Sequence, residues 1–416
     1  MRLRIDWAIR LYKRLNFNFM NRKNFSLVSI VLILLFCSCK GIFKPSFQKT
    51  PAGQTIERNQ EWDKVFARKS GWIGGDIAAS FVIPGNRVLW VFGDSFIGEV
   101  KDNKRVGATM VNNAIAVHPY DESNPGKAPK QEEIKFYWGQ TDKAQNPSAW
   151  VKPSKTESSN SWYWFTGGGV VFDEPEDEHQ LALFLIEMKK KGADKSVWGF
   201  ECAGSAMVII ANVKEEPEVW TRRIIDLPHI ADWGISAFYE RTEHYVFIYA
   251  NKSDENNQRD LILARARPEN FENFSQWEFF AGKDKWLNSP SNAIVIIKNI
   301  SSEMSIDKIP DKTGASHYVM IYSEPFLGNR IFVRTASYPE GPWSEPEPIY
   351  RVPDIQNEEN HRLFAYASKG HYAISEPGTL LVSYIINSND FSDLINNASI
   401  YQPRFISVPL RLIFIN

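Results

Sequence analysis

The chain has 416 residues, of which 43% are hydrophobic and 23% are charged, so it is long enough and apolar enough to bury a large core. Its 48 basic and 49 acidic residues leave a net charge of −1, and the basic residues form no stripe interleaved with aromatic residues. Nucleic-acid binding depends on such a stripe, so a nucleic-acid partner is disfavoured.

The N-terminal segment has the pattern of a bacterial lipoprotein signal peptide. An apolar run at 25–38 follows two basic residues, and it is shorter than the ~20 residues that a membrane-spanning helix needs. The run ends at a small residue followed by Cys39, which resembles the box where lipoprotein precursors are cleaved and acylated. We predict a signal peptide at 1–38, with Met20 as an alternative translation start that shortens it to 20–38, and lipidation of Cys39. An uncleaved transmembrane anchor is the alternative.

The segment after the lipidation site is typical of a tether. Residues 39–61 contain Gly, Pro, Gln, Thr and Lys without periodicity, and a single folded domain is predicted at 62–416. Lys40 resembles an outer-membrane sorting signal, so we expect a lipid anchor in the outer membrane of a bacterial envelope, with either side possible for the domain. After cleavage Cys202 is the only free thiol of the exported domain, which therefore has no disulfide framework.

The first predicted β-hairpin joins strands at 77–83 and 87–92 through a turn centred on Gly85. If this turn has three residues, residue i faces residue 170 − i (twice 85), and Asp76 faces Asp94. Two opposed carboxylates share one site and their pKa values separate, which suits an acid/base pair. A two-residue turn would shift the register and turn one carboxylate away. Alternatively, both aspartates only cap turns.

Four further hairpins are predicted along the chain, each a strand, a turn and a very apolar second strand. They pair 167–172 with 180–188, 233–239 with 244–250, 292–297 with 316–322, and 366–375 with 379–386. More strand-like segments follow at 260–267, 277–282 and 330–337. The pattern predicts an all-β five-bladed propeller with four-stranded antiparallel blades around a central funnel. A pair of β-sandwiches is the alternative. In the propeller, a C-terminal strand at 405–408 or 410–415 should complete a blade begun near the N-terminus.

Polar residues recur where the predicted inner strands start. A loop centred between Arg241 and Thr242 places Asp232 opposite Asn251. In a propeller such starts converge on the funnel, so Asp76, Asp232 and His371 are expected to meet there. For each of them, the alternative is an ordinary turn residue.

Other chemistries lack their motifs. The sequence contains no His-Glu-x-x-His, no cysteine pair with zinc spacing, no phosphate loop and no Gly-x-Ser-x-Gly elbow. We therefore predict no metal site and no cofactor, and we expect carboxylate chemistry.

Taken together, several segments resemble a family of secreted bacterial five-bladed propeller proteins catalogued as a domain of unknown function. Some members of that family are endo-D-arabinanases, and its architecture is similar to that of arabinanase and fructanase propellers. The segments that carry the resemblance are 71–76 (Gly-Trp-Ile-Gly-Gly-Asp), 90–94 (Trp-Val-Phe-Gly-Asp), 232–234 (Asp-Trp-Gly) with Tyr249, 341–343 (Gly-Pro-Trp), 380–384 (Leu-Leu-Val-Ser-Tyr) and 403–405 (Pro-Arg-Phe).

The chain departs from this family at two places. Ala250 stands where relatives more often have Gly, and 371–373 (His-Tyr-Ala) replaces a His-Pro-Glu type of segment. The second change removes an acidic residue from a funnel-facing strand start. A complete catalytic set therefore cannot be carried over from the family.

The resemblance and the paired aspartates imply a glycoside hydrolase that acts on a furanoside-containing polysaccharide of the arabinan type. We assign Asp76 as nucleophile or base, Asp94 as its electrostatic partner and Glu187 as the acid, with Asp232 as the next candidate. The expected contacts to the polysaccharide or oligosaccharide are Trp72, Trp162, Trp164, Trp233, Asn251, His371 and Arg404. The competing hypotheses are a non-catalytic glycan-binding lipoprotein and a structural envelope protein without a ligand.

Overall fold

The computed structural model describes residues 56–141, 146–153, 161–172, 180–192, 199–253, 258–325, 328–355 and 362–414. The predicted signal peptide and Cys39 lie outside these residues. Among the described helices, none has the length and apolar character needed to cross a membrane.

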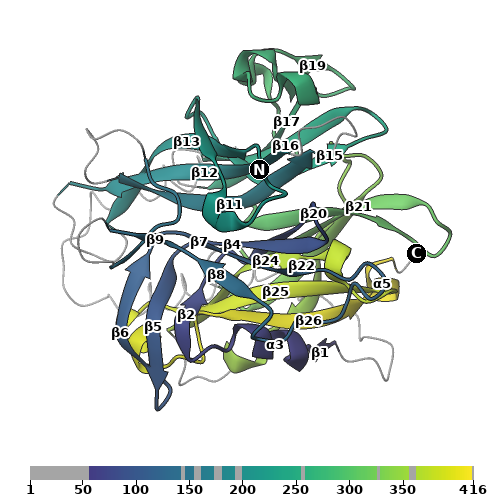
Figure 1. Ribbon diagram of the computed structural model, residues 1–416. Coiled ribbons are helices and arrows are strands. Elements are labelled where there is room, and N and C mark those ends of the chain that lie inside the picture. The colour runs from purple at the N-terminus through teal and green to yellow at the C-terminus, as the bar shows by residue number, and fades with distance from the viewer. Residues whose placement is uncertain are drawn as a thin grey trace, which may run out of the picture. The chain divides into compact units, whose positions relative to one another are not determined.

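The described part of the chain forms a five-bladed β-propeller of antiparallel sheets, numbered here as blades 1 to 5 in chain order (Figure 1). Blade 1 consists of β3 (Ala79–Ile83), β4 (Arg87–Phe92), β7 (Ala114–Pro119) and β8 (Lys135–Tyr137). Blade 2 consists of β11 (Ser161–Phe172), β12 (Gln180–Lys190), β13 (Phe200–Ile210) and β14 (Arg222–Leu227). Blade 3 has a fifth strand and consists of β15 (Asp232–Glu240), β16 (Tyr245–Ser253), β17 (Arg259–Ala266), β18 (Glu278–Phe280) and β19 (Trp286–Leu287).

The last two blades complete the ring. Blade 4 consists of β20 (Met304–Pro310), β21 (Ser316–Ser323), β22 (Arg330–Ala336) and β23 (Glu347–Arg351). Blade 5 consists of β24 (Leu363–Gly370), β25 (Thr379–Ser388), β26 (Pro403–Pro409) and β1 (Glu57–Arg58). The inner strands contact one another in the order β3, β11, β15, β20 and β24, and the turn after β24 returns to β3. This closed ring confirms the predicted fold class and excludes two sandwiches.

Smaller elements surround the blades. A separate sheet contains β2 (Ser70–Gly75), β5 (Ser95–Lys101) and β6 (Lys104–Val111), and β9 (Gly139–Gln140) pairs with β10 (Pro147–Ser148). The described α-helices are α3 (Gln60–Phe66), α4 (Phe391–Asn396) and α5 (Leu410–Ile413). Short 3₁₀ turns occur at Pro217–Val219, Pro268–Asn270, Phe274–Gln276, Pro290–Asn292, Pro353–Ile355 and Tyr372–Ile374.

The two ends of the described chain meet in blade 5, where β26 pairs with β1 so that Ser407 faces Glu57. Figure 1 shows the purple N-terminal elements β1 and α3 beside the yellow strand β26. The predicted joining of C-terminal and N-terminal strands is confirmed for 405–408, whereas Leu410–Ile413 is a helix. The last residues of the segment predicted as a tether therefore belong to a blade.

The core explains why β4 is apolar on both faces. Val88, Trp90 and Phe92 pack in one cluster with α3 and blade 5. Leu89 and Val91 pack in a second cluster with the inner strands of blade 2. Burying each such side chain contributes about 1.5–3 kcal/mol, so a strand between two blades is stabilised on both faces.

The register of the first hairpin agrees with the sequence prediction. Ala79 faces Val91 and Ile83 faces Arg87, so the turn has three residues centred on Gly85. In the third hairpin Asp232 faces Asn251 as predicted. There the turn lies further along the chain than predicted, and a bulge in β15 restores the pairing at its open end.

Blade 4 corrects one predicted strand. Residues 292–297 were expected to form the inner strand, but Pro290–Asn292 is a 3₁₀ turn, and Ile294 and Val295 are 42% and 37% exposed. The inner strand is β20 instead, which pairs with β21. Blade 5 needs a smaller correction, because β24 ends at Gly370 and a 3₁₀ turn follows it.

Candidate active site

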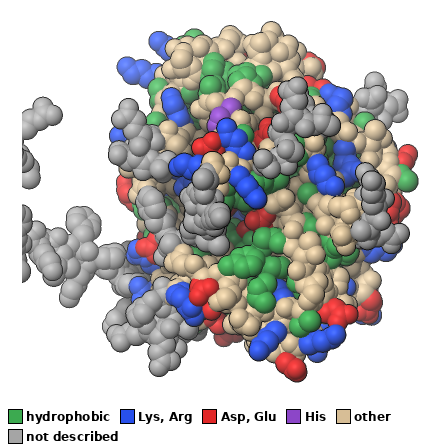
Figure 2. Space-filling view, turned by 90° about the vertical axis from the view of Figure 1, so that its left-hand side faces the viewer, with side chains coloured by type: hydrophobic (Ala, Val, Ile, Leu, Met, Phe, Trp, Pro, Cys, Tyr) green, Lys and Arg blue, Asp and Glu red, His purple; other side chains and the backbone are tan. Residues whose placement is uncertain are grey.

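A pocket of about 630 Å³ lies where several inner strands begin, and its volume suits a small ligand or a few sugar units. Its acidic lining residues are Asp76, Asp94 and Glu303. Its aromatic lining residues include Trp164, Phe165, Phe200, Phe364, Phe391, Tyr366 and Tyr401. Near the centre of the face shown in Figure 2, acidic side chains lie beside a patch of hydrophobic ones. The pocket therefore combines carboxylates with apolar ring faces.

The backbone around Asp76 is tightly constrained. The next two residues, Ile77 and Ala78, have φ values of 65° and 50°, which are uncommon for non-glycine residues and costly for a β-branched one. The N–H of Gly93 donates to the Asp76 carbonyl at 3.2 Å, and the N–H of Asp76 donates to the Asp94 carbonyl at 3.3 Å. A Cβ at Gly93 would lie 2.3 Å from Asp76 Oδ1, so only glycine leaves room for this carboxylate.

Two tyrosines from blade 5 and its C-terminal connection hold the Asp76 carboxylate. The Tyr366 hydroxyl donates to Asp76 Oδ2 at 2.7 Å, and the Tyr401 hydroxyl donates to the same oxygen at 3.0 Å. Burial raises the pKa of Asp76 to about 8, with a further increase from the charge of Asp94, although the tyrosine hydrogen bonds oppose both. Burial and the neighbouring charge therefore favour the protonated form of Asp76.

Asp94 has a different environment on the same pocket wall. Its Oδ1 accepts hydrogen bonds from Trp164 Nε1 at 2.7 Å and from Asn112 Nδ2 at 3.3 Å. Burial raises the pKa of Asp94 to about 6, and the two N–H donors limit the increase because they favour the charged carboxylate. Near pH 7 the coupled pair therefore holds one proton and one negative charge, and the two N–H donors favour the charge on Asp94.

Glu303 is a third carboxylate of the pocket that the sequence analysis did not single out. It directly precedes β20, and its negative charge raises the pKa of Asp76 further. Ser302 Oγ donates to Glu303 Oε2 at 2.8 Å, and Asn251 Nδ2 donates to the Ser302 carbonyl at 3.0 Å. Since polar residues recur at inner-strand starts, a correct placement of β20 would have identified Glu303.

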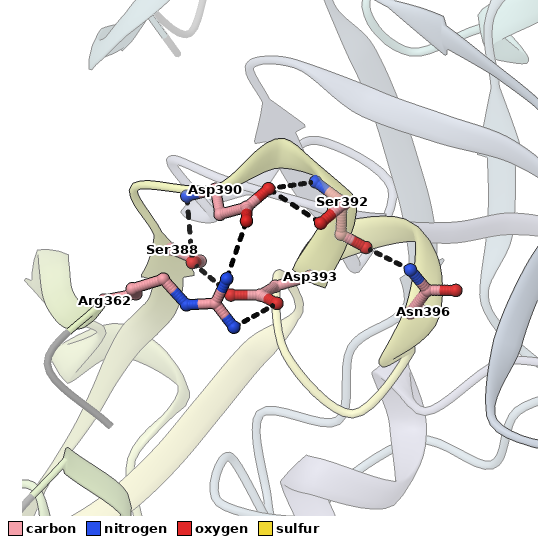
Figure 3. A network of polar contacts seen from close by, with 6 residues as sticks. All are labelled: Arg362, Ser388, Asp390, Ser392, Asp393 and Asn396. Atoms are coloured by element: carbon pink, nitrogen blue, oxygen red, sulfur yellow. Dashed lines mark hydrogen bonds and ion pairs between the residues drawn. The ribbon is translucent and has the colours of Figure 1, made fainter. Parts of the chain in front are cut away.

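Helix α4 forms another part of the wall, because Phe391 and Leu394 line the pocket. Asp390 caps this helix through the Ser392 N–H at 2.9 Å. Arg362 reaches Asp390 at 2.6 Å and Asp393 at 3.0 Å (Figure 3). This network ties the helix to the start of β24 and so fixes the position of its two apolar side chains.

Trp164 is the predicted aromatic contact that lines the pocket, where it also binds Asp94. Trp162 packs edge-on against Trp164 with ring centroids 5.9 Å apart, and it is not among the lining residues. Trp72 and Trp233 are 1% and 0% exposed. The expectation that they contact a glycan is corrected, because both rings are enclosed in the hydrophobic core.

Three other predicted contacts have structural roles in the described chain. His371 lies buried between the hydroxyls of Ser80 at 2.7 Å and Ser383 at 2.8 Å, and burial lowers its pKa to about 3, so it is a neutral link between blades. Asn251 is buried and supports the segment before Glu303. Arg404 donates to the Ser399 carbonyl. None of them lines the pocket, so their assignment as direct contacts is corrected.

The two remaining acidic candidates also lie outside the pocket lining. Glu187 pairs with Tyr163 and Gly204 in blade 2, on the opposite strand face from Ile186, which does line the pocket. Asp232 lies beside Cys202, with Oδ1 3.9 Å from the sulfur. With His229 these two residues form the group among the described residues whose ligand atoms could hold a metal ion.

Comparison with known proteins shows a family and a fold. The family model described as "Domain of unknown function (DUF5005)" matches residues 59–409. The crystal structure of a Bacteroides ovatus ATCC 8483 protein, provisionally described as a hydrolase, superposes with a TM-score of 0.67 at 18% identity, over 86% of this chain and 92% of that chain. This likeness shows the fold. No curated protein matches the sequence.

Two further solved structures are less similar. A thermostable family-43 glycoside hydrolase has a TM-score of 0.41 at 10% identity, over 81% of this chain and 89% of that chain. The α-L-arabinofuranosidase from Podospora anserina has a TM-score of 0.39 at 10% identity, over 81% of this chain and 91% of that chain. At these TM-scores neither structure bears on the chemistry of the pocket.

Proposed function

The chain belongs to the family described as "Domain of unknown function (DUF5005)", and we propose that its pocket hydrolyses glycosidic bonds, with Asp76 as general acid and Asp94 as the ionised carboxylate. The observation that carries this proposal is the unequal pair of aspartates on one pocket wall. Two carboxyl groups whose environments separate their pKa values are the usual requirement for acid/base glycoside hydrolysis.

The roles follow from the hydrogen bonds. Asp76 donates its proton to the leaving glycosidic oxygen while the bond from that oxygen to the anomeric carbon breaks. Asp94 keeps its negative charge through its two N–H donors, so it stabilises the positive charge that develops on the anomeric carbon. The oxygen of a water molecule then bonds to the anomeric carbon, and Asp76, now ionised, takes the proton that this water loses. This assignment makes Asp76 the acid in the first step, whereas the sequence had suggested a nucleophile or base.

The rest of the pocket supports a sugar ligand. Trp164, Phe200 and Phe391 present aromatic rings to the pocket, and such rings pack on the C–H faces of sugars. Arg259 and Asn387 add polar groups that can orient hydroxyls. The preference for furanoside sugars of the arabinan type rests on the family resemblance of the sequence.

The test is a screen of the purified protein on arabinan, arabinogalactan and fructan, with analysis of the products. New reducing ends that disappear in both Asp76→Asn and Asp94→Asn would support the proposal. The matched control is Asp307→Asn. Asp307 lies on β20 outside the pocket lining, and desolvation raises its pKa to about 6, as it does for Asp94. Binding of a glycan without new reducing ends would refute hydrolysis and favour a glycan-binding protein.

We also propose that Cys39 carries the lipid anchor of an outer-membrane lipoprotein. Stable anchoring requires more than one acyl chain, and a diacylated and N-acylated cysteine provides them. The wild-type protein should partition with membranes, and Cys39→Ala should release it. Soluble wild-type protein, or membrane-bound Cys39→Ala, would contradict the anchor.

A further inference from the structure

Three side chains that can bind metal ions converge at the junction of blades 2 and 3. Cys202 lies on β13, and His229 and Asp232 lie in the connection from β14 and at the start of β15. Cys202 Sγ is 3.7 Å from His229 Nδ1 and 3.9 Å from Asp232 Oδ1. All three ligand atoms lie within 4.8 Å of one another. No spacing in the sequence indicated this group, because sheet pairing brings its members together.

These separations agree with a tetrahedral zinc site. Zinc binds thiolate sulfur at about 2.3 Å and imidazole nitrogen or carboxylate oxygen at about 2.0–2.2 Å, so neighbouring ligand atoms lie roughly 3.5 Å apart. The two distances from the sulfur exceed this value by a few tenths of an ångström, and the His229–Asp232 separation is at most 4.8 Å, so closing the site around an ion also requires a rotation of the exposed His229 side chain. A thiolate, an imidazole and a carboxylate together are a donor set that suits zinc better than magnesium or calcium.

The arrangement does not fit a cysteine nucleophile. In a Cys-His-Asp triad the carboxylate bonds to the histidine and orients it toward the sulfur. Here the Asp232 carboxylate approaches the Cys202 sulfur itself. The imidazole and the carboxylate both surround the sulfur, as ligands around one ion do.

We propose that Cys202, His229 and Asp232 bind one zinc ion, with a fourth position open to water. The Cys202 thiol proton passes to solvent when the ion binds. His229 is exposed, so the ion can enter from solvent. The ion would join β13 to the start of β15. This junction lies beside the pocket, because Phe200 on β13 lines the pocket. Arg259, whose charge acts on Asp232, also lines it. The site is independent of the proposed hydrolysis.

The test uses the purified protein after treatment with a chelator. Cobalt(II) is titrated in, because a thiolate ligand gives it a charge-transfer absorption in the near ultraviolet, and zinc is then added in competition. We expect one cobalt ion per chain at this site. Cys202→Ser should abolish the absorption, and His229→Ala and Asp232→Asn should each weaken binding at least tenfold, as loss of a direct ligand must exceed the effect of second-shell changes.

The matched control is His317→Ala. His317 Nε2 lies 3.1 Å from Asp311 Oδ2, a histidine–carboxylate pair that lacks a thiol partner, so this variant should bind cobalt like the wild type. In the mature protein proposed above, Cys37 is removed with the signal peptide and the sulfur of Cys39 is acylated, so a thiolate absorption can come only from Cys202. Zinc should raise the melting temperature of the wild type and leave Cys202→Ser unchanged.

The proposal would be overturned by wild-type protein without the thiolate absorption, or by an absorption that persists in Cys202→Ser. An equal loss of cobalt affinity in His317→Ala and in His229→Ala would also overturn it. The melting measurement needs no variant, so a wild type without a zinc-dependent shift contradicts the site even if a variant fails to fold.

Discussion

Asp76→Asn should make the protein more stable at neutral pH, and the gain should depend on pH. The amide keeps the volume of the carboxyl group, and its oxygen can still accept the Tyr366 and Tyr401 hydrogen bonds. In the wild type, burial and the charge of Asp94 raise the pKa of Asp76 from 3.8 to about 8. The folded protein therefore holds a proton that the unfolded chain has lost. The stability that this proton gives is present at low pH and is lost as the pH rises toward about 8.

The magnitude follows from the difference of one bound proton. Between pH 5 and pH 7 the unfolded Asp76 is ionised and the folded one is protonated, so the free energy of unfolding falls by about 1.4 kcal/mol per pH unit, or about 2.7 kcal/mol in all. The variant lacks this titration. The difference in unfolding free energy between variant and wild type should therefore grow by about 2–3 kcal/mol over this range, while the contribution of Asp94 is present in both proteins.

Urea unfolding of both proteins at pH 5 and pH 7 measures this difference. The control is Asp102→Asn, an exposed turn residue with φ of 49°, a conformation that asparagine also tolerates. This control measures the effect of replacing an exposed carboxylate at both pH values. A difference in unfolding free energy between Asp76→Asn and the wild type that is the same at pH 5 and pH 7 would show that Asp76 is not protonated in the folded protein and would refute the assignment of Asp76 as the acid.

Three predictions concern the pH dependence of kcat/KM on the glycan that the screen identifies. The profile of the wild type should be bell-shaped, with kcat/KM falling below about pH 6 as Asp94 is protonated and above about pH 8 as Asp76 ionises. A kcat/KM that is constant across both limits would contradict this prediction. Glu303→Gln removes a charge that raises the pKa of Asp76, so the alkaline limb should move to lower pH; an unmoved limb would separate Glu303 from the pair. Trp164→Phe removes a hydrogen-bond donor to the Asp94 carboxylate, so the acid limb should move to higher pH by about 1 unit. An unmoved acid limb would show that this hydrogen bond does not stabilise the charged form of Asp94.

Local features of the site could be predicted from the sequence. The turn around Gly85 fixes the register of the first hairpin, and this register, with a backbone hydrogen bond from Asp76 to Asp94, brings the two residues together. Such a prediction succeeds because the two residues are close in the sequence and the hairpin loop leaves few alternatives. The number of blades was predictable for a similar reason, since each hairpin has its own turn and apolar strands.

The partners of Asp76 could not be predicted, because they come from the far end of the chain. Tyr366 and Tyr401 are 290 and 325 residues away, and only the closure of blade 5 against blade 1 brings them near. Glu303 was missed because the apolar run at 292–297 has more strand character than β20, whose sequence includes Asp307 and Lys308. Lys308 is accommodated by an ion pair with Glu240 at 2.6 Å, a contact that composition does not reveal.

Aromatic residues show a second limit of the sequence. Trp72 and Trp164 are both on strands near the first two hairpins, and nothing in their neighbours separates a core ring from a pocket ring. The difference arises from packing between sheets. Trp72 stacks on Phe136 at 4.7 Å in the core, whereas Trp164 faces Asp94 and the pocket. Sequence patterns therefore predict that an aromatic residue lies on a strand, but they do not predict whether its ring lies in the core or in the pocket.

The most direct test of the account is turnover by Asp76→Asn and Asp94→Asn on the identified glycan, each compared with Asp307→Asn. Loss of an acid or base typically reduces the rate 10²–10⁴-fold. We expect a reduction of at least this size for both pocket variants with unchanged folding, and near wild-type turnover for Asp307→Asn. Wild-type turnover in either pocket variant would contradict the central claim that these two aspartates perform the hydrolysis.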